Sequence, residues 1–317
     1  MTIVQLSYII AVDNFKSFAK AAKNCYVTQP TLSMQIKKLE DELGVLIFDR
    51  TKKPVAPTDI GVKIIEQART VTVEHERIKE VIREESEEIR GKFKLGIIPT
   101  VAPYLLPLFV ESFTKKYNAL ELIIEELQTD RIVDSLRRDE LDAAILATPL
   151  FYKDITERPL YYEPFVGYVS ESHRLAKNKR IDSNELEVKD LFLLKEGHCF
   201  RDHVLQICKY YGDGKDTSVK KVNLEGATLE TLIKMVDKNI GMTLIPFLAM
   251  KELEGTPREK SIRKFKKPVP TREISIVYHR AHLKKKLIDL LESAIRGSIP
   301  DELINSKKEF VLNTKIS

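Results

Sequence analysis

The most restrictive pattern in this chain is an amphipathic helix near its N-terminus. Its apolar residues follow one another at spacings of 4, 3 and 4: Leu32, Ile36, Leu39 and Leu43. This spacing predicts a helix that buries one side. Thr28 is placed to cap its start and Gly44 to cap its end. The segment must therefore pack against neighbouring elements while its other side stays exposed.

The exposed side of this helix carries short polar and basic residues. Gln29, Ser33 and Lys37 follow one another four residues apart. Two more helical patterns precede it, at residues 6–13 and 17–23. Together they predict a helix-turn-helix with a polar recognition face. Polar helix faces are often only solvated, but the basic residues that follow in a wing favour DNA: Arg50, Lys52 and Lys53.

A second helical pattern links this segment to the rest of the chain. From Thr58 to Gly91 the apolar seam repeats at spacings of 4 and 3: Ile64, Ala68, Val71, His75, Ile78 and Ile82. A charged helix with such a seam needs a partner, which predicts a coiled-coil-like dimer. We interpret His75 as a packing residue of the seam. The predicted boundaries are 1–58 for the DNA-binding domain and 59–90 for the linker helix.

The remaining chain alternates strand and helix patterns, which predicts an α/β fold with parallel strands. The expected strands are 93–98, 120–127, 142–147, 191–194, 219–224 and 272–278, with a long passage at 155–169. The expected helices are 102–117, 132–138, 229–238 and one from Leu283 onward. We expect a two-lobed regulatory domain at 91–300, with lobe I at about 91–161 and 268–300 and lobe II at about 162–267. The tail, 301–317, carries no signal.

Two cysteines flank a third helical pattern. Cys199 follows Gly197 and His198, where a helix begins with Phe200, Val204 and Ile207 on one side. A thiol at or near a helix N-cap is favoured as a thiolate, so Cys199 is a candidate for an accessible, reactive thiol of low pKa. The residues alone fit an inert cysteine equally well. Cys208 lies nine positions further on, about 13 Å along a continuous helix and on its opposite side. Because a disulfide needs Cα atoms within about 7 Å, these thiols can join only if the helix unwinds.

Composition narrows the class of protein. The chain has 317 residues, of which 43% are hydrophobic and 31% charged, and its net charge of +5 permits nucleic-acid binding. Three cysteines in this length do not form a disulfide framework and fit a reducing compartment. No apolar run approaches a membrane span and no secretory leader is recognisable, so we expect a cytoplasmic protein without a membrane partner.

The N-terminal motif resembles the winged helix-turn-helix of LysR-type transcriptional regulators. The resemblance covers residues 15–51, FKSFAKAAKNCYVTQPTLSMQIKKLEDELGVLIFDRT. It implies contacts to bases or nearby backbone from Thr28, Gln29, Pro30, Thr31 and Ser33. It implies phosphate contacts from Lys37 and Arg50. It also implies a linker-helix dimer that assembles into a homotetramer on an operator, a periplasmic-binding-protein-like regulatory domain, and RNA polymerase as a partner.

Two further motifs, IPTVAPYLLP and GHCFRD, resemble the hydrogen-peroxide-sensing OxyR branch of that family. This resemblance implies that peroxide oxidises Cys199 and that Cys208 resolves the product as a disulfide. The residues implied to bind or support peroxide are Thr100, Thr129, His198, Arg201 and Asp202. No cofactor and no metal are implied. One departure from the branch is Asp216-Thr217-Ser218, where a histidine is often found.

Other interpretations stay open at this point. The expected cleft between the lobes would also suit a small metabolite, with the cysteines incidental. Thr100 and Thr129 also fit simple helix caps after strands. A peroxidase fused to a DNA-binding head is disfavoured because no C-x-x-C motif is present. A metal set of His198, Cys199, His203 and Cys208 lacks the spacing of known sites.

Overall fold

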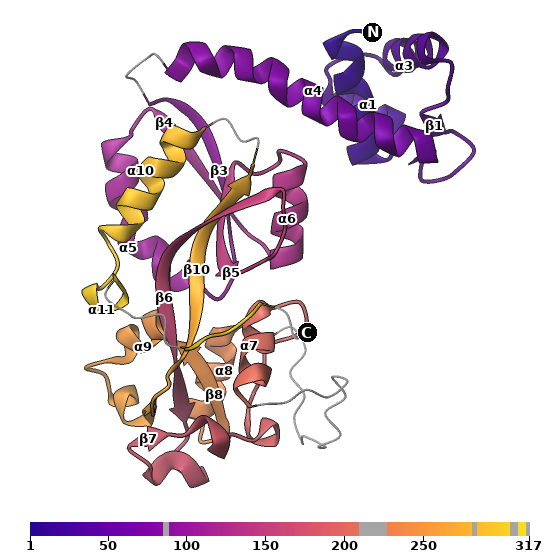
Figure 1. Cartoon of the computed structure of the whole chain (residues 1–317). Helices are drawn as coiled ribbons and strands as arrows, with labels where there is room; N and C mark the ends of the chain where they lie inside the picture. The colour runs from indigo at the N-terminus through magenta and orange to yellow at the C-terminus, as the bar shows by residue number, and fades with distance from the viewer. Residues whose placement is uncertain (85–88, 209–226, 281–283, 305–309, 315–317) are drawn as a thin grey trace. The chain divides into compact units, whose positions relative to one another are not determined.

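The computed structural model describes residues 1–84, 89–208, 227–280, 284–304 and 310–314. The chain divides into two compact units, Met1–Glu87 and Glu88–Ser317, and Figure 1 labels most of their helices and strands. Among the described residues, no helix has the length and apolar character to cross a membrane.

The first unit is a helix-turn-helix with a small wing. Its elements are α1 (Ile3–Phe15), α2 (Phe18–Asn24), α3 (Gln29–Leu43), β1 (Phe48–Asp49), β2 (Ala56–Pro57) and α4 (Asp59–Glu84). The predicted caps of α3 are confirmed, because the Thr28 hydroxyl accepts from the Thr31 N–H and Gly44 adopts a left-handed φ of 68°. The predicted end of the linker helix at Gly91 is wrong, since Gly91 begins the next strand.

Glu40 joins α3 to the wing. Its Oε1 accepts from the backbone N–H groups of Ile47 (2.8 Å) and Phe48 (3.2 Å). Its Oε2 accepts from Arg50 (3.1 Å). Glu40 is 4% exposed, whereas Leu43 is 39% exposed. The prediction that Leu43 belongs to the buried side is therefore wrong, and a carboxylate that satisfies two backbone donors is buried instead.

The second unit is built on one sheet whose strand order is β4-β3-β5-β10-β6-β9-β7, with β8 paired to β6 and β11 to β10. The strands are β3 (Gly91–Ile97), β4 (Leu120–Glu126), β5 (Ala143–Thr148), β6 (Ile155–Val169), β7 (Arg180–Ile181), β8 (Met242–Pro246), β9 (Ile262–Phe265), β10 (Pro270–His279) and β11 (Phe310–Val311). Parallel pairing holds for β3 with β4 and β5, but β10 and β6 pair antiparallel with each other. The predicted parallel sheet is thus only part of a mixed one.

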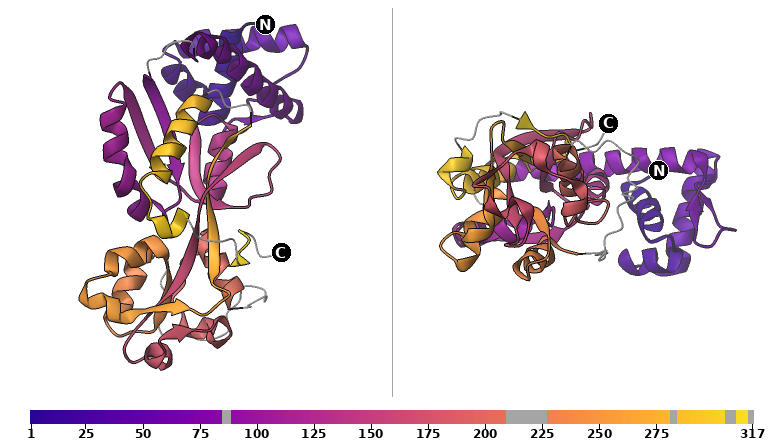
Figure 2. Two further views of the ribbon diagram at one scale, coloured as in Figure 1. Left: turned by 60° about the vertical axis from the view of Figure 1, so that its left-hand side comes forward. Right: turned by 90° about the horizontal axis from the view of Figure 1, so that it is seen from below.

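Helices cover this sheet in two lobes. They are α5 (Ala102–Lys116), α6 (Thr129–Arg137), α7 (Cys199–Ile207), α8 (Leu229–Asp237), α9 (Phe247–Leu253), α10 (Lys285–Arg296) and α11 (Asp301–Ile304). Short 3-10 helices lie at Arg174–Lys177, Ser183–Glu185, Val188–Asp190 and Pro257–Ser261. Figures 1 and 2 show β6 and β10 running from the lobe of β3–β5 into the lobe of β8 and α7–α9. This arrangement confirms a two-lobed domain joined by crossover strands.

Two predicted strands of the second lobe have different outcomes. The run Leu191–Leu194 forms only an isolated bridge from Leu191 to Met242, so the predicted strand is wrong. Its backbone is nonetheless attached to the sheet, because the Phe192 N–H donates to the Met242 carbonyl (2.8 Å). The predicted strand 219–224 lies outside the described residues.

The Glu40 contacts generate a prediction about the wing. In Glu40→Ala, two buried N–H groups lose their acceptor, so we expect the free energy of unfolding of the first unit to fall by about 2–3 kcal/mol. Glu40→Gln keeps an acceptor oxygen and serves as the matched control, with a smaller loss. Urea denaturation, together with hydrogen exchange of the Ile47 and Phe48 amides, measures both variants. An Ala variant as stable as the wild type would contradict the assignment.

Candidate functional site

Cys199 is the first residue of α7, and it lies where the two lobes meet. Its N-cap neighbour His198 makes no side-chain capping bond. Gly197 precedes them with φ of 90°, and a Cβ there would lie 3.1 Å from the Gln128 side chain. Gln128 is the N-cap of α6 in the other lobe. The start of α7 is therefore packed directly against the start of α6.

The Cys199 thiol is buried, with 8% of the residue exposed. Burial raises the pKa of this thiol, while the nearby charge of Arg272 and a contact from Thr129 lower it, and Asp202 raises it. The net direction is upward. The expectation of an accessible thiol of low pKa is therefore wrong for this structure, because loss of water outweighs the helix terminus and the nearby cation.

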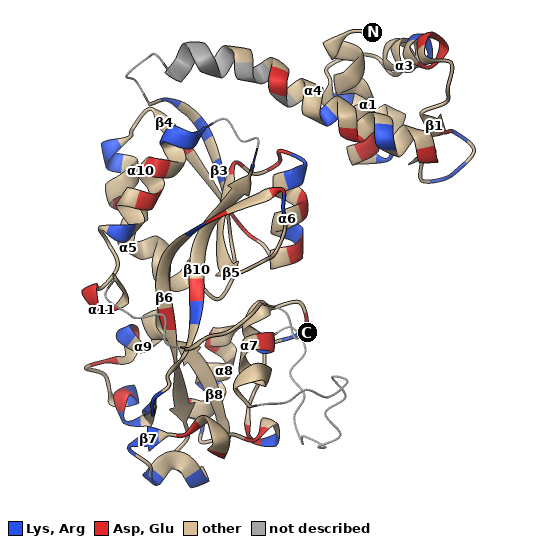
Figure 3. Cartoon of the chain, in the orientation of Figure 1, with Lys and Arg blue, Asp and Glu red and all other residues tan. Residues whose placement is uncertain are grey.

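Arg272, on β10, supplies the positive charge at the site. Its Nε donates to Glu163 Oε2 on β6 (2.9 Å), and its Nη2 lies 2.7 Å from the same oxygen. Nη1 donates to the Thr100 hydroxyl (2.9 Å) and Nη2 to the Thr100 carbonyl (3.1 Å). The guanidinium also lies over the Phe200 ring of α7, 5.2 Å from its centroid. Figure 3 shows the charged positions midway along β6 and β10.

The predicted threonines come from the first lobe. Thr100 is buried and its oxygen accepts from Arg272, so its own hydroxyl proton is directed elsewhere. Thr129 begins α6, and its hydroxyl lies close enough to Cys199 to lower the pKa of the thiol. The hydroxyl forms no hydrogen bond of normal geometry to any described group. The structure thus brings Thr100, Thr129 and Arg272 to one place, around Cys199.

The three polar neighbours of Cys199 in sequence differ in their surroundings. Burial lowers the pKa of His198, which favours the neutral imidazole. Arg201 donates to the Leu194 carbonyl (3.3 Å) and so ties the preceding loop to the helix. Burial raises the pKa of Asp202, although Arg201 opposes it. The cation that lowers the pKa of Cys199 is Arg272.

Cys208 is the C-cap of α7, at the opposite end from Cys199. The helix between them is unbroken, so their Cα atoms are separated by a rise of about 13 Å and the side chains leave opposite sides of the helix. All three cysteines, including Cys25, carry thiols rather than a disulfide. In this arrangement the two α7 thiols cannot react with each other.

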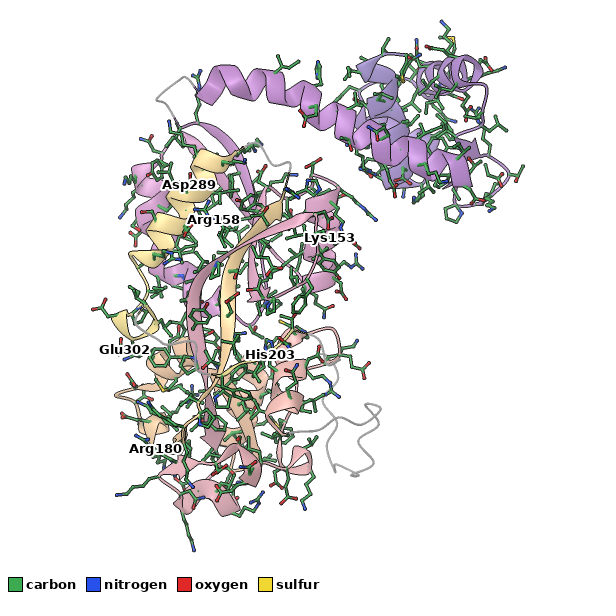
Figure 4. All side chains as sticks on the ribbon, viewed as in Figure 1. Lys153, Arg158, Arg180, His203, Asp289 and Glu302 are labelled. Atoms are coloured by element: carbon green, nitrogen blue, oxygen red, sulfur yellow. The ribbon has the colours of Figure 1, made fainter. Side chains whose placement is uncertain are left out.

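His203 lies one turn after Cys199 on α7 and is fully buried. Neither ring nitrogen has a hydrogen-bond partner among the described residues. Its ring packs edge-on against Phe165 of β6, with centroids 5.8 Å apart. Burial and the charge of Arg272 lower the pKa of His203 to about 3. Figure 4 labels this side chain beside the two crossover strands.

The predicted DNA-contact residues lie together at the start of α3 and in the wing. Thr28, Gln29, Pro30, Thr31 and Lys37 are exposed. The other two predicted residues, Ser33 and Arg50, contact each other. Arg50 donates to the Ser33 hydroxyl (3.3 Å) and also to Glu40. The Arg50 guanidinium also lies 5.1 Å from the Phe18 ring centroid. Arg50 therefore has a local structural role, and its contact to phosphate stays a prediction.

Sequence reasoning missed Arg272 and Glu163. The sequence places Arg272 only in an expected strand and Glu163 only in the passage at 155–169, and neither lies near the cysteines in sequence. A signal was present, because Glu163 stands beside the apolar and aromatic run 160–162 and Arg272 stands just before the largely apolar run 274–278. Charged residues at such positions are rarely buried unless they are paired.

The buried imidazole of His203 makes the free energy of unfolding depend on pH. Its folded-state pKa of about 3 lies below the unfolded value of roughly 6.5, so only the unfolded chain binds a proton between these values. Stability should therefore fall as pH decreases from about 6.5, by up to about 1.4 kcal/mol per pH unit from this group. Urea unfolding of His203→Leu should show a flatter dependence than the wild type. Equal slopes for His203→Leu and the wild type would contradict a neutral buried His203.

Comparison with known proteins shows which family this chain resembles along its length. Residues 3–62 match the bacterial regulatory helix-turn-helix protein, lysR family, and residues 86–297 match the LysR substrate binding domain. The hydrogen peroxide-inducible genes activator of Haemophilus influenzae is 35% identical over 94% of this chain and 97% of its own length. The DNA-binding transcriptional dual regulator OxyR of Escherichia coli K12 is 36% identical over 94% and 95%.

The fold agrees with these relatives. Full-length OxyR C199D from Pseudomonas aeruginosa has a TM-score of 0.77 and 36% identity, covering 94% of this chain and 99% of that one. Each of these relatives covers 94% of this chain, so the similarity includes residues of both units. The chain belongs to the LysR family of bacterial transcriptional regulators, within its OxyR branch.

Proposed function

We propose that this protein is a transcriptional regulator that senses hydrogen peroxide through Cys199 and signals through a Cys199–Cys208 disulfide. One observation carries the proposal: a single short helix has a thiol at each end, and the first thiol lies beside Arg272 and Thr129 at the junction of the lobes. A disulfide in this helix cannot form without changing the structure of that junction.

In the first step, peroxide enters beside Cys199 and the thiolate attacks one peroxide oxygen. The S–O bond forms, the O–O bond breaks, and the second oxygen leaves as water after it takes up a proton. Arg272 stabilises the thiolate, and the hydroxyls of Thr100 and Thr129 hold the peroxide oxygens. Burial keeps the resting thiol protonated, so the thiol first releases its proton, and the departing hydroxide takes up that proton to leave as water.

In the second step, the Cys208 thiolate attacks the sulfenic sulfur of Cys199. The S–S bond forms, the S–O bond breaks, and a second water leaves. Because α7 must unwind, its buried residues Phe200, Val204 and Ile207 leave their packing in the core. Such repacking changes how the lobes meet, and the change passes to the DNA-binding units of a homodimer or homotetramer.

The output is control of transcription from an operator. The polar start of α3, from Thr28 to Ser33, reads bases or nearby backbone in the major groove. Lys37 and Arg50 bind phosphates, and the seam of α4 pairs two copies. Val71 and Ile78, two seam residues, are exposed in the single chain, which suits such pairing. RNA polymerase is the proposed partner of the oxidised form.

The Cys199 assignment can be tested directly. Cys199→Ser should abolish peroxide-dependent gene control and leave DNA affinity within a few-fold, because the serine cannot form a sulfenic acid. Mass spectrometry of peroxide-treated wild type should show a Cys199–Cys208 link. Cys25→Ser, far from the site in sequence, is the matched control. Normal peroxide induction in Cys199→Ser would leave the small-metabolite interpretation in its place.

The Lys37 assignment concerns the DNA interface. Lys37→Ala should weaken binding about equally for all sequences and reduce the slope of log affinity against log salt by about 1, because one phosphate contact is lost. Lys63→Ala, an exposed lysine on α4, is the control. Titrations at several salt concentrations measure the effect. A change in base preference with an unchanged salt slope would show that Lys37 reads bases instead.

A further inference from the structure

The last described residues of the chain, 310–314, pack beside α7, the helix that has Cys199 and Cys208 at its ends. Strand β11 pairs in parallel with β10, with Phe310 opposite Pro270 and Val311 opposite Thr271. The Leu312 N–H then donates to the Thr271 carbonyl (2.9 Å). This places the segment on β10 immediately before Arg272. Asn313, two residues after β11, contacts Gln206 of α7.

The position on β10 is an open sheet edge. Strand β5 pairs with β10 only from Glu273 onward, where Thr148 is its partner. The first residues of β10 on that side would otherwise offer unpaired backbone groups between the lobes. Strand β11 pairs with this part of β10, and the Leu312 N–H hydrogen-bonds to one of these backbone groups, the Thr271 carbonyl. The segment is therefore an added strand that fills the gap left at the end of β5.

Three further contacts fasten the segment to its surroundings. Gln206 of α7 makes a reciprocal pair with Asn313: the amide donates to the Asn313 carbonyl (2.8 Å), and the Asn313 N–H donates to the Gln206 amide oxygen (3.2 Å). Leu312 is 3% exposed within the core of the second unit. The Thr314 hydroxyl donates to the Pro149 carbonyl, just after β5. The segment thus touches α7, β10 and the first lobe.

These contacts matter for α7 because Gln206 lies between Cys199 and Cys208. Unwinding the helix must move Gln206, and this movement breaks both hydrogen bonds to Asn313. The same movement frees the segment from one of its anchors beside Arg272. A helix of nine residues has little stability of its own, so its tertiary contacts decide how readily it opens.

We propose that residues 310–314 act as a strap that holds α7 helical in the reduced protein and slows disulfide formation. This inference rests on the proposed function, because it concerns the second oxidation step. The strap does not touch the Cys199 thiol and leaves the first step, attack on peroxide, unchanged. Its release accompanies the unwinding of α7, and its affinity for the β10 edge sets how much of the sulfenic acid proceeds to the disulfide.

The test uses full-length protein with changes in the strap alone. Leu312→Asp places a charge at a buried position and undocks the segment. Phe310→Asp introduces the same charge at a position that is 41% exposed, so it is the matched control. Asn313→Pro is a second variant without a new charge: it removes the N–H that donates to Gln206 and restricts the backbone at residues 312 and 313. None of these changes alters α7 itself.

Three measurements separate the steps. Hydrogen exchange of the α7 amides in the reduced protein measures how the strap affects opening of the helix, without any oxidation. Trapping of sulfenic acid in a Cys208→Ser background reads the first step. Thiol mapping after a pulse of peroxide reads the rate of the Cys199–Cys208 link. We expect Leu312→Asp to speed both exchange and disulfide formation about tenfold, Asn313→Pro to do so by less, and the sulfenic step to stay unchanged.

The outcomes distinguish the strap from the sensor. Unchanged exchange and disulfide rates in both Leu312→Asp and Asn313→Pro would overturn the strap. Equal effects of Phe310→Asp and Leu312→Asp would also overturn it, because the effect would then come from charge rather than docking. Absence of the Cys199–Cys208 link in the wild type contradicts the proposed function instead, whatever the exchange of α7 shows.

Discussion

The buried ion pair of Glu163 and Arg272 joins the two strands that pass between the lobes of the regulatory unit. Both residues are 1% exposed and lie on the two strands that pass between the lobes. Glu163 also accepts from the Leu248 N–H at the start of α9 (3.0 Å), and Arg272 binds both oxygens of Thr100. A buried pair of this kind is costly to desolvate and very costly to break, because each charge alone would be unpaired. It therefore fixes the register of β6 against β10.

The same pair sets the chemistry of Cys199. A buried thiol beside a fully free guanidinium would ionise readily, but Glu163 neutralises much of the charge of Arg272. The sulfur consequently experiences two opposing effects, loss of water and a partly neutralised cation, and loss of water dominates. Any movement that weakens the Glu163 contact or admits water shifts this balance toward the thiolate. Structural stability and thiol reactivity thus depend on one interaction.

The sequence predicts the elements of this chain better than it predicts the surroundings of its cysteine. Helix caps and apolar spacing located α3 and α7 because those signals are local. The low pKa expected for Cys199 was wrong because the thiol is buried at a place where Thr129 of the other lobe approaches it, and local sequence does not report that approach. The predicted strand 191–194 failed because its apolar residues pack without forming a ladder. Arg272 escaped notice for a related reason: its role comes from pairing across strands that are far apart in sequence.

The two ends of α7 are controlled by different parts of the chain. At its start, Cys199 is enclosed by α6 and by the crossover strands, which are fixed by the ion pair. Near its end, Gln206 is bound by Asn313 of the C-terminal segment. In the proposed mechanism, oxidation acts on the first end, whereas completion of the disulfide requires the second end to detach. A helix held separately at its two ends can then react with peroxide before it rearranges, and in this proposal the contacts at Gln206, rather than the chemistry at Cys199, govern the time between these events.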